Sequence, residues 1–163
     1  QLQEMIRMKY FIAITFLLTL VFTLESTAES TNTNPEFDAE LAAKLGADDY
    51  GMKSYVLVML KSGSNTSQDE VAKNTAFKGQ MDNIKHLVKR DKLIVAGPMG
   101  KNDKSYRGIF ILNVTTLDEA KALLKTDPAI QEQYLNAELY NWYGSAALAE
   151  YLPASDKIWK VSP

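Results

Sequence analysis

The chain has one histidine, His86, and no cysteine, and these two facts limit the chemistry available to it. Without cysteine there is no thiol nucleophile and no thiolate metal ligand. A zinc site would need three carboxylates beside His86, a poor match to the ligands that zinc prefers, so we expect no metal. On the predicted helix, His86 shares its face with Asp82, Lys89 and Arg90. Because that face is polar, we expect a solvated surface histidine and not a catalytic base.

Three other groups of residues are candidates for ligand contacts. Arg107 follows a lysine-containing turn, where its guanidinium can pair with an anionic ligand or simply be solvated. Trp142 and Tyr143 lie near the end of a predicted strand, where aromatic rings can wall a pocket or pack in a dimer. Gly97 and Gly108 allow a close backbone approach to a ligand, and equally a tight turn. Which of these groups meet in one site depends on the elements that carry them.

The composition is that of an ordinary globular domain. The 163 residues are 46% hydrophobic and 23% charged, which suits one domain with one core. The net charge of −2 lacks the basic face that a nucleic-acid binder needs, so we expect no nucleic-acid partner. No pattern in the chain predicts a cofactor.

The first 28 residues have the pattern of a secretory signal peptide, with additional residues upstream. Met8 and Lys9 precede an apolar region at about 10–24, and Ser26 and Ala28 supply the small residues of a cleavage site. This apolar run is shorter than the ~20 residues that span a bilayer. We expect cleavage after Ala28 and a periplasmic or secreted protein, with an uncleaved membrane anchor as the alternative.

Residues 29–50 are predicted to be a linker with one short amphipathic helix. Asn34 is the expected N-cap, followed by proline at the first helical position. Phe37, Leu41 and Leu45 form the apolar stripe, and Gly46 ends the helix. So short a helix needs a docking surface to be stable.

Downstream, strand and helix patterns alternate in the order β-α-β-β-α-β. The first helix follows Ser67, and the second is capped by Thr116 and broken at Asp127-Pro128. The first helix has a predicted apolar stripe of Val71, Phe77, Met81, Ile84 and Val88. The expected strands are 53–61, 92–98, 106–114 and 134–144. The segment 145–160, "SAALAEYLPASDKIWK", is expected to contain a short helix that ends at Pro153.

This order predicts an α+β, ferredoxin-like domain over residues 51–152, followed by a tail of residues 153–163. Its four-stranded antiparallel sheet would have both helices on one face. The strands are apolar on both faces: Tyr55, Leu57 and Met59 alternate with other large apolar residues. Burying each such side chain contributes about 1.5–3 kcal/mol. We therefore expect the second face to be covered by another copy, in a homodimer that packs sheet to sheet.

The segments "KLIVAGPM", "YRGIFILNVTTLDEAKALLKTDPAIQ" and "LYNWYGSAAL" resemble those of the YCII-related (YciI-like) domain family. The resemblance covers about residues 51–152 and implies a ferredoxin-like dimer of the dimeric α+β barrel superfamily. It also implies an active site made by a histidine of the first helix and the aspartate of the Asp-Pro motif. Asp127 matches that aspartate, whereas Gln80 stands at the histidine position.

Gln80 lies one helical turn from Phe77 and Ile84, so it borders the apolar stripe and can face the sheet. Its amide can orient a ligand or Asp127 but has no proton to exchange near neutral pH. Asp127 with a raised pKa can act alone as acid or base, or can serve only as a cap before Pro128.

Three functions follow as expectations. The first is binding of a small anionic or carbonyl-bearing ligand near Asp127, with contacts from Gln80, Arg107, Gly97, Pro98 and Trp142. The second is an enzyme of lyase or isomerase type that uses Asp127 as its lone acid or base. The third is a structural or partner-binding module with a vestigial site.

Overall fold

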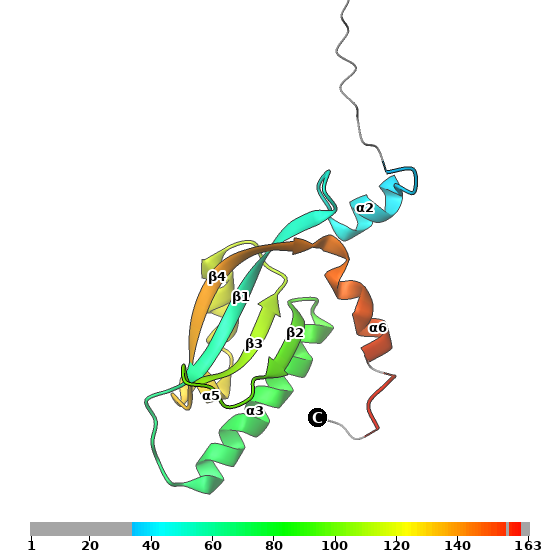
Figure 1. Cartoon of the computed structure of the whole chain (residues 1–163). Coiled ribbons are helices and arrows are strands. Elements are labelled where there is room, and N and C mark those ends of the chain that lie inside the picture. The colour runs from blue at the N-terminus through cyan, green and yellow to red at the C-terminus, as the bar shows by residue number, and fades with distance from the viewer. Residues whose placement is uncertain (1–33, 156, 161–163) are drawn as a thin grey trace, which may run out of the picture. The chain divides into compact units, whose positions relative to one another are not determined.

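The protein is built on a four-stranded antiparallel sheet with the strand order β2-β3-β1-β4 (Figure 1). The structure is a computed structural model and describes residues 34–155 and 157–160. The expected α+β class and the β-α-β-β-α-β order are confirmed, with a second short helix after the Asp-Pro step. The elements are α2 (Ala39–Leu45), β1 (Met52–Ser62), α3 (Glu70–Lys89), β2 (Leu93–Pro98), β3 (Tyr106–Leu112), α4 (Leu117–Leu124), α5 (Pro128–Gln131), β4 (Leu135–Ser145), the 3₁₀ helix η1 (Ala146–Tyr151) and α6 (Leu152–Ser155).

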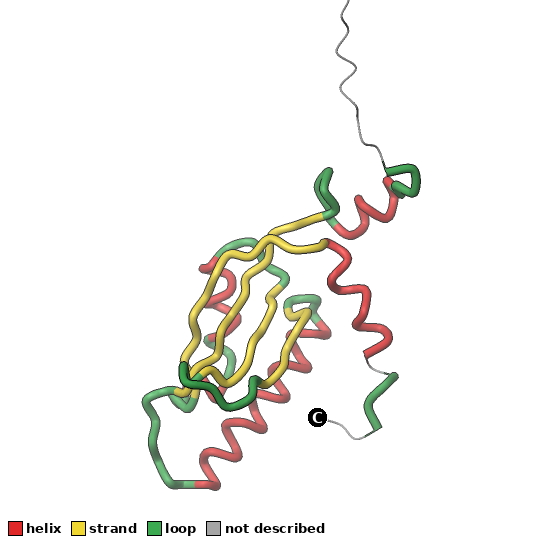
Figure 2. Tube along the Cα trace, viewed as in Figure 1, coloured by secondary structure: helices red, strands yellow, loops and turns green. Residues whose placement is uncertain are grey.

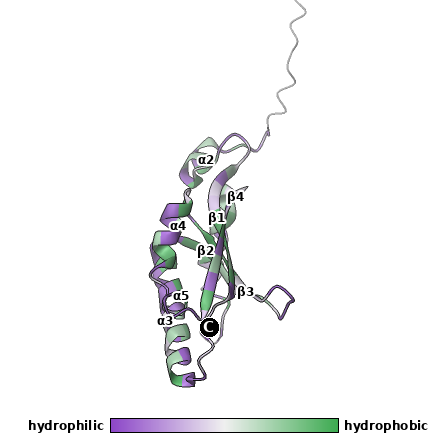
Figure 3. Ribbon diagram, turned by 90° about the vertical axis from the view of Figure 1, so that its left-hand side faces the viewer, coloured by the Kyte–Doolittle hydropathy of each residue, from purple (hydrophilic) through white to green (hydrophobic). Residues whose placement is uncertain are grey.

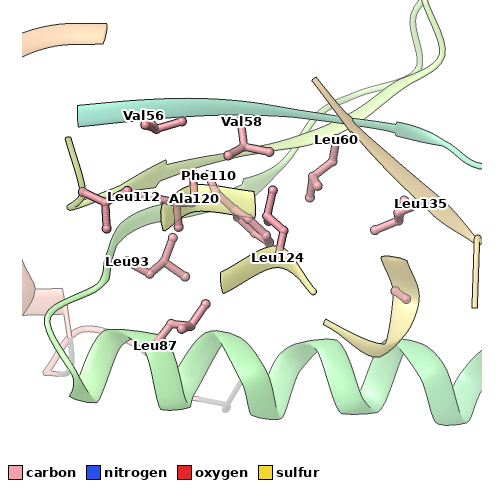
Figure 4. Close-up of a cluster of buried hydrophobic side chains, with 12 residues drawn as sticks. Val56, Val58, Leu60, Leu87, Leu93, Phe110, Leu112, Ala120, Leu124 and Leu135 are labelled. Carbon is pink, nitrogen blue, oxygen red and sulfur yellow. The ribbon is translucent and has the colours of Figure 1, made fainter. Parts of the chain in front are cut away.

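The helices α3, α4 and α5 cover one face of the sheet, which we call the helix face (Figure 3). Val56, Val58 and Leu60 alternate along β1 and point into this core. Leu87 reaches them from α3, and Leu124 from α4 (Figure 4). The alternation predicted for the first strand is therefore confirmed.

The opposite face, here called the open face, is partly covered by the chain itself. Tyr55, Ile94 and Ile111 are buried there, with Leu148 and Ala149 of η1 packed against them. The helical segment follows directly from β4 (Figure 2). The prediction that only a second copy covers this face is wrong for this part, because the tail helix was not expected to fold back onto the sheet.

The short N-terminal helix begins later than predicted. The Asn34 side chain accepts a hydrogen bond from the backbone N–H of Glu36, which makes a local turn instead of a helix cap. Asp38 is the N-cap of α2, since its carboxylate accepts from the Leu41 N–H at 2.9 Å. The predicted end is confirmed: Gly46 has φ 70°, a conformation that glycine adopts without strain.

Two further local predictions are wrong. Val71 is 78% exposed although it fits the apolar stripe of α3, because the first turn of this helix extends beyond the sheet-facing core. Pro153 lies inside α6 and does not end a helix. Its missing N–H costs nothing there, since the first turn of a helix has no intrahelical acceptor for it.

The predicted signal segment and its cleavage site lie outside the described residues. Within the described residues, no helix is both long and apolar enough to cross a membrane.

Candidate functional site

Helix α3 and the start of α5 approach each other closely because position 79 has no side chain. A Cβ atom at Gly79 would lie 2.7 Å from Cγ of Pro128, closer than such atoms approach in proteins. One residue further along α3, Gln80 is 7% exposed and faces Asp127. The sequence predicted that Gln80 borders the apolar stripe of the helix, and its burial confirms this; the contact with Asp127 was left open.

Asp127 has no solvent exposure and uses both carboxylate oxygens. Oδ1 accepts from the backbone N–H groups of Ala129 (2.9 Å) and Ile130 (3.4 Å), so Asp127 is the N-cap of α5. Oδ2 accepts from Nε2 of Gln80 at 3.2 Å. The capping role weighed for Asp127 is thus confirmed, and the two positions implied by the family resemblance are within hydrogen-bond distance.

A third contact continues this line of pairs. The Thr126 hydroxyl donates to Oδ1 of Asn83 at 2.9 Å, one turn beyond Gln80. Together the pairs join α3 to the segment before α5, and we call them the α3–α5 latch. Its members are Gly79, Gln80, Asn83, Thr126, Asp127 and Pro128.

The electrostatics of Asp127 follow from its burial. Removal from water raises the pKa of the carboxyl above its usual value, and the hydrogen bonds from Ala129, Gln80 and Ile130 offset this only in part. A carboxyl with a raised pKa suits acid–base chemistry. However, a substrate must reach hydrogen-bond distance of such a group. The burial of both Asp127 and Gln80 closes that approach.

The other four residues predicted to contact a ligand lie on the strands. Gly97 and Pro98 end β2, opposite Ile109 and Gly108 of β3. Arg107 is exposed on β3. Trp142 packs against Tyr55 on the open face, with ring centroids 5.5 Å apart. The structure thus joins Gln80 to Asp127, and the part played by the other four stays a prediction.

His86 is exposed on α3, as predicted from its polar face. Its Nε2 atom lies 3.4 Å from Nη1 of Arg90, one turn further along. His86 therefore lies on the surface of the helix, as a solvated residue would.

A hollow of about 510 Å³ opens where β1 ends and β4 begins, and we call it the strand-end hollow. The Ser64 hydroxyl donates to Oε1 of Gln133 at 2.9 Å across the two segments that form it. Ile130 brings the end of α5 into its wall. It is lined by Ser62, Gly63, Ser64, Ile130, Gln133, Leu135 and Asn136.

Sequence reasoning missed this hollow. The segment "SGSNTS" has only the composition of a loop, and its partner near Gln133 is far along the chain. Gly63 was the one signal available: a Cβ there would lie 1.9 Å from the carbonyl oxygen of Gln133, so only glycine fits. None of the lining side chains is charged. The hollow therefore suits neutral hydrogen-bonding groups such as carbonyls and hydroxyls.

A second polar cluster lies on the open face, around Glu138 of β4. The Lys61 ammonium is 2.8 Å from Oε1, and the hydroxyls of Tyr140 (3.2 Å) and Tyr106 (3.3 Å) donate to Oε2. Lys61 also lies 5.8 Å from the centre of the Tyr106 ring. We call these four residues the Glu138 quartet.

A β-bulge assembles the quartet. The register between β1 and β3 steps from Leu60–Gly108 to Lys61–Tyr106, which leaves Arg107 as the extra residue. Leu60 faces the helices and Lys61 the open face, so the bulge turns Tyr106 toward Lys61. The sequence carried no signal for this cluster, because its members come from three strands and meet only through that register.

Three members of the quartet shift one another's pKa values. The hydrogen-bonded Lys61 ammonium holds the pKa of Glu138 below its usual value, and Glu138 in turn raises the pKa of Lys61. Glu138 also raises the pKa of the Tyr140 phenol. These shifts favour the charged forms of Lys61 and Glu138 and the protonated phenol of Tyr140, an arrangement that suits recognition better than proton transfer.

Among the described residues, no group of three histidine, cysteine, aspartate or glutamate side chains is placed to hold a metal ion. No protein-family model matches the chain, and no curated protein matches it either.

Proposed function

We propose that this chain is a small-molecule-binding module of YCII type, with its ligand in the strand-end hollow. The observation that carries this proposal is the hollow itself, which combines two serine hydroxyls and two side-chain amides with no charged lining group. A small ligand with carbonyl or hydroxyl groups matches these donors and acceptors. This lining favours the carbonyl-bearing class over the anionic class that the sequence left open.

The α3–α5 latch positions one wall of this site. Asp127 caps α5 and bonds to Gln80, so it holds the helix whose Ile130 lines the hollow. Asp127 and Gln80 are then positioning residues. Their burial supports binding over a lyase or isomerase reaction that would use the Asp127 carboxyl as its acid or base.

The proposal includes a homodimer formed through the open face. Helix η1 covers only one part of that face. Leu57, Met59 and Ile109 on the same face stay half-buried, and Tyr140 is 49% exposed. A second copy would remove these side chains from water. The test is analytical ultracentrifugation of Ile109→Arg, which should be monomeric at concentrations where the wild type is a dimer.

Val71→Arg is the matched control for that experiment, because Val71 is also an exposed apolar residue but lies on α3. It should dimerise as the wild type does. Equal dimerisation of Ile109→Arg and the wild type would exclude the open face as the interface.

The ligand site is tested by thermal-shift measurements with acetamide, pyruvate and acetate as probes. We expect the neutral amide to stabilise the wild type most, since a ligand that binds only the folded state raises the unfolding midpoint. Ser62→Phe should abolish this shift by filling the hollow. Ser54→Phe is the control, at an exposed position of the same strand away from the hollow. Loss of the shift in both variants, or in neither, would contradict the proposal.

A further inference from the structure

The open face has an uncovered patch with a defined arrangement of side chains. Strand register places Leu57 beside Tyr140 and Met59 beside Glu138, and on its other side Met59 faces Ile109. Lys61 and Tyr106 form the next pair along the strands. Apolar side chains and the Glu138 quartet therefore share one continuous surface, half of it charged or polar.

The hydrogen bonds within the quartet allow its charged pair to be buried in an interface. An ion pair at a solvated surface needs no further partners, and it contributes little there. Here the Glu138 carboxylate accepts from three side chains, and the side chains of Lys61 and Glu138 are only 36% and 34% exposed. Burial of a charged pair is tolerated when its remaining hydrogen-bonding positions are filled in this way. The arrangement is that of a polar centre in an interface.

A second copy of this chain is the partner that fits the patch. The patch has one cation and one anion, so a two-fold axis can place the Lys61 of each copy near the Glu138 of the other. The same surface serves both sides of such a contact. Tyr140, half-exposed beside Leu57, is of the type that contributes most to interfaces.

We infer that the Glu138 quartet is the specificity element of a sheet-to-sheet homodimer, where its two opposite charges fix how the copies align. This inference rests on the proposed dimer and adds to it the residues that select the partner. The hydrophobic residues drive association, and the charges exclude other alignments, because alignments that bring like charges together are disfavoured.

Charge reversal tests this inference. Lys61→Glu leaves each patch with two negative charges, and Glu138→Lys leaves two positive charges. Each variant alone should dimerise at least tenfold more weakly than the wild type in sedimentation analysis from 1 to 200 µM. Mixed together, the two variants should form a heterodimer that is at least tenfold tighter than either homodimer. The double variant should regain the wild-type affinity to within about fivefold.

A role of these residues in monomer stability alone would not produce heterodimer preference, so the mixing experiment separates the two explanations. Circular dichroism checks that each variant is folded. Should a reversed variant fail to fold, Lys61→Gln and Glu138→Gln replace the pair, and each should weaken the dimer and reduce its dependence on salt. Lys121→Glu is the control, because the Lys121–Asp118 pair (3.1 Å) lies on α4 and should leave dimerisation unchanged.

The outcomes distinguish this inference from the proposed dimer. A wild-type dimer that Ile109→Arg disrupts but charge reversal does not affect would overturn the specificity role and leave the interface in place. A wild type that stays monomeric up to 200 µM would overturn both.

Discussion

Two carboxylates on opposite sides of the sheet each accept three hydrogen bonds, yet they behave in opposite ways. Asp127, on the helix face, is fully buried and has a raised pKa because desolvation outweighs its hydrogen bonds. Glu138, on the open face, has a lowered pKa because one of its three donors is the Lys61 ammonium, a cation. The number of hydrogen bonds therefore does not decide the direction of the pKa shift. The direction depends on whether the carboxyl loses water without a compensating positive charge beside it.

The comparison also separates structural from recognition roles. The Asp127 carboxylate bonds to groups that belong to α3 and α5, so it joins two helices. The Glu138 carboxylate organises a cluster that solvent or another molecule can reach. Substitutions at these two carboxylates and at the residues around them test this contrast.

Asp127→Ala should have the largest effect. It removes the cap of α5 and leaves the Gln80 amide without its buried partner, so we expect the free energy of unfolding to fall by about 2–4 kcal/mol. Urea denaturation monitored by circular dichroism measures this. Asp118→Ala is the control: Asp118 also belongs to the first turn of a helix, but its side chain is 93% exposed, so its removal should change little. Similar losses in both variants would show that Asp127 is no more than a surface cap.

Gly79→Ala should destabilise the protein by about 1–3 kcal/mol, although alanine is the better helix former by about 1 kcal/mol. The added Cβ would meet the stiff Pro128 ring at 2.7 Å, so α3 and α5 would have to separate. Thermal and urea unfolding both report the loss. Gly100→Ala, where nothing lies within 4 Å of the new atom, should be neutral. A stabilised Gly79→Ala would mean that the latch is not a close contact.

Asp127→Asn should change the pH dependence of stability more than stability itself. Asparagine can still cap α5, and Gln80 can turn its amide to present an acceptor. Burial raises the folded-state pKa of Asp127 above its unfolded value, so the folded state holds the proton more tightly. Its stabilising contribution is therefore full below the ordinary pKa of about 4 and is lost as the pH rises through the folded-state pKa.

The variant lacks this contribution, so the wild type should gain stability relative to Asp127→Asn as the pH falls from 7 to below 4. Urea titrations at several pH values give the difference. A difference that stays constant with pH, or that grows as pH rises, would mean that the folded state does not raise the pKa of Asp127.

Lys61→Met should have the smallest effect on stability, because the ion pair is partly exposed. Its effect should be seen in the titration of Glu138. Loss of the ammonium removes the main cause of the lowered pKa, so the Glu138 pKa should rise toward its usual value. Carbon-13 NMR of the carboxyl group measures it, and Lys121→Met serves as the control. An unchanged Glu138 pKa would show that the Lys61 ammonium is not what lowers it.

The sequence was sufficient to predict the features that depend on local side-chain chemistry or on the alternation of apolar residues along a strand. The alternation of apolar residues in β1 predicted that Val56 and Tyr55 lie on opposite faces of the sheet, and they do. Thr116 caps the second helix as expected, because its hydroxyl accepts from the Glu119 N–H. Helical spacing placed Gln80 at the border of the apolar stripe, as its burial confirms. These are short-range signals, and the residues that carry them are neighbours in the chain. The Gln80–Asp127 contact joins residues 47 positions apart, and helical spacing alone could not show it.

The features that were missed depend on contacts between distant segments. No local pattern shows the bulge that turns Tyr106 toward Lys61. Similarly, η1 contacts the open face through residues far along the chain from it: Leu148 and Ala149 pack there, and the Tyr151 hydroxyl donates to the backbone carbonyl of Ile94 in β2. Val71 has the spacing of the apolar stripe but is exposed. Helical spacing shows which residues share a face of the helix, but it does not show which turns of the helix lie over the sheet.

The central position of β1 has a consequence for how this protein folds. β1 is the first strand in the chain, yet it pairs with β3 and β4 and not with the strand that follows it. The edge of β1 that pairs with β4 therefore stays open during synthesis until the last strand has appeared. Such long-range pairing slows folding and exposes apolar strand edges to other chains. The interval before β4 arrives is thus when the chain most needs protection from aggregation.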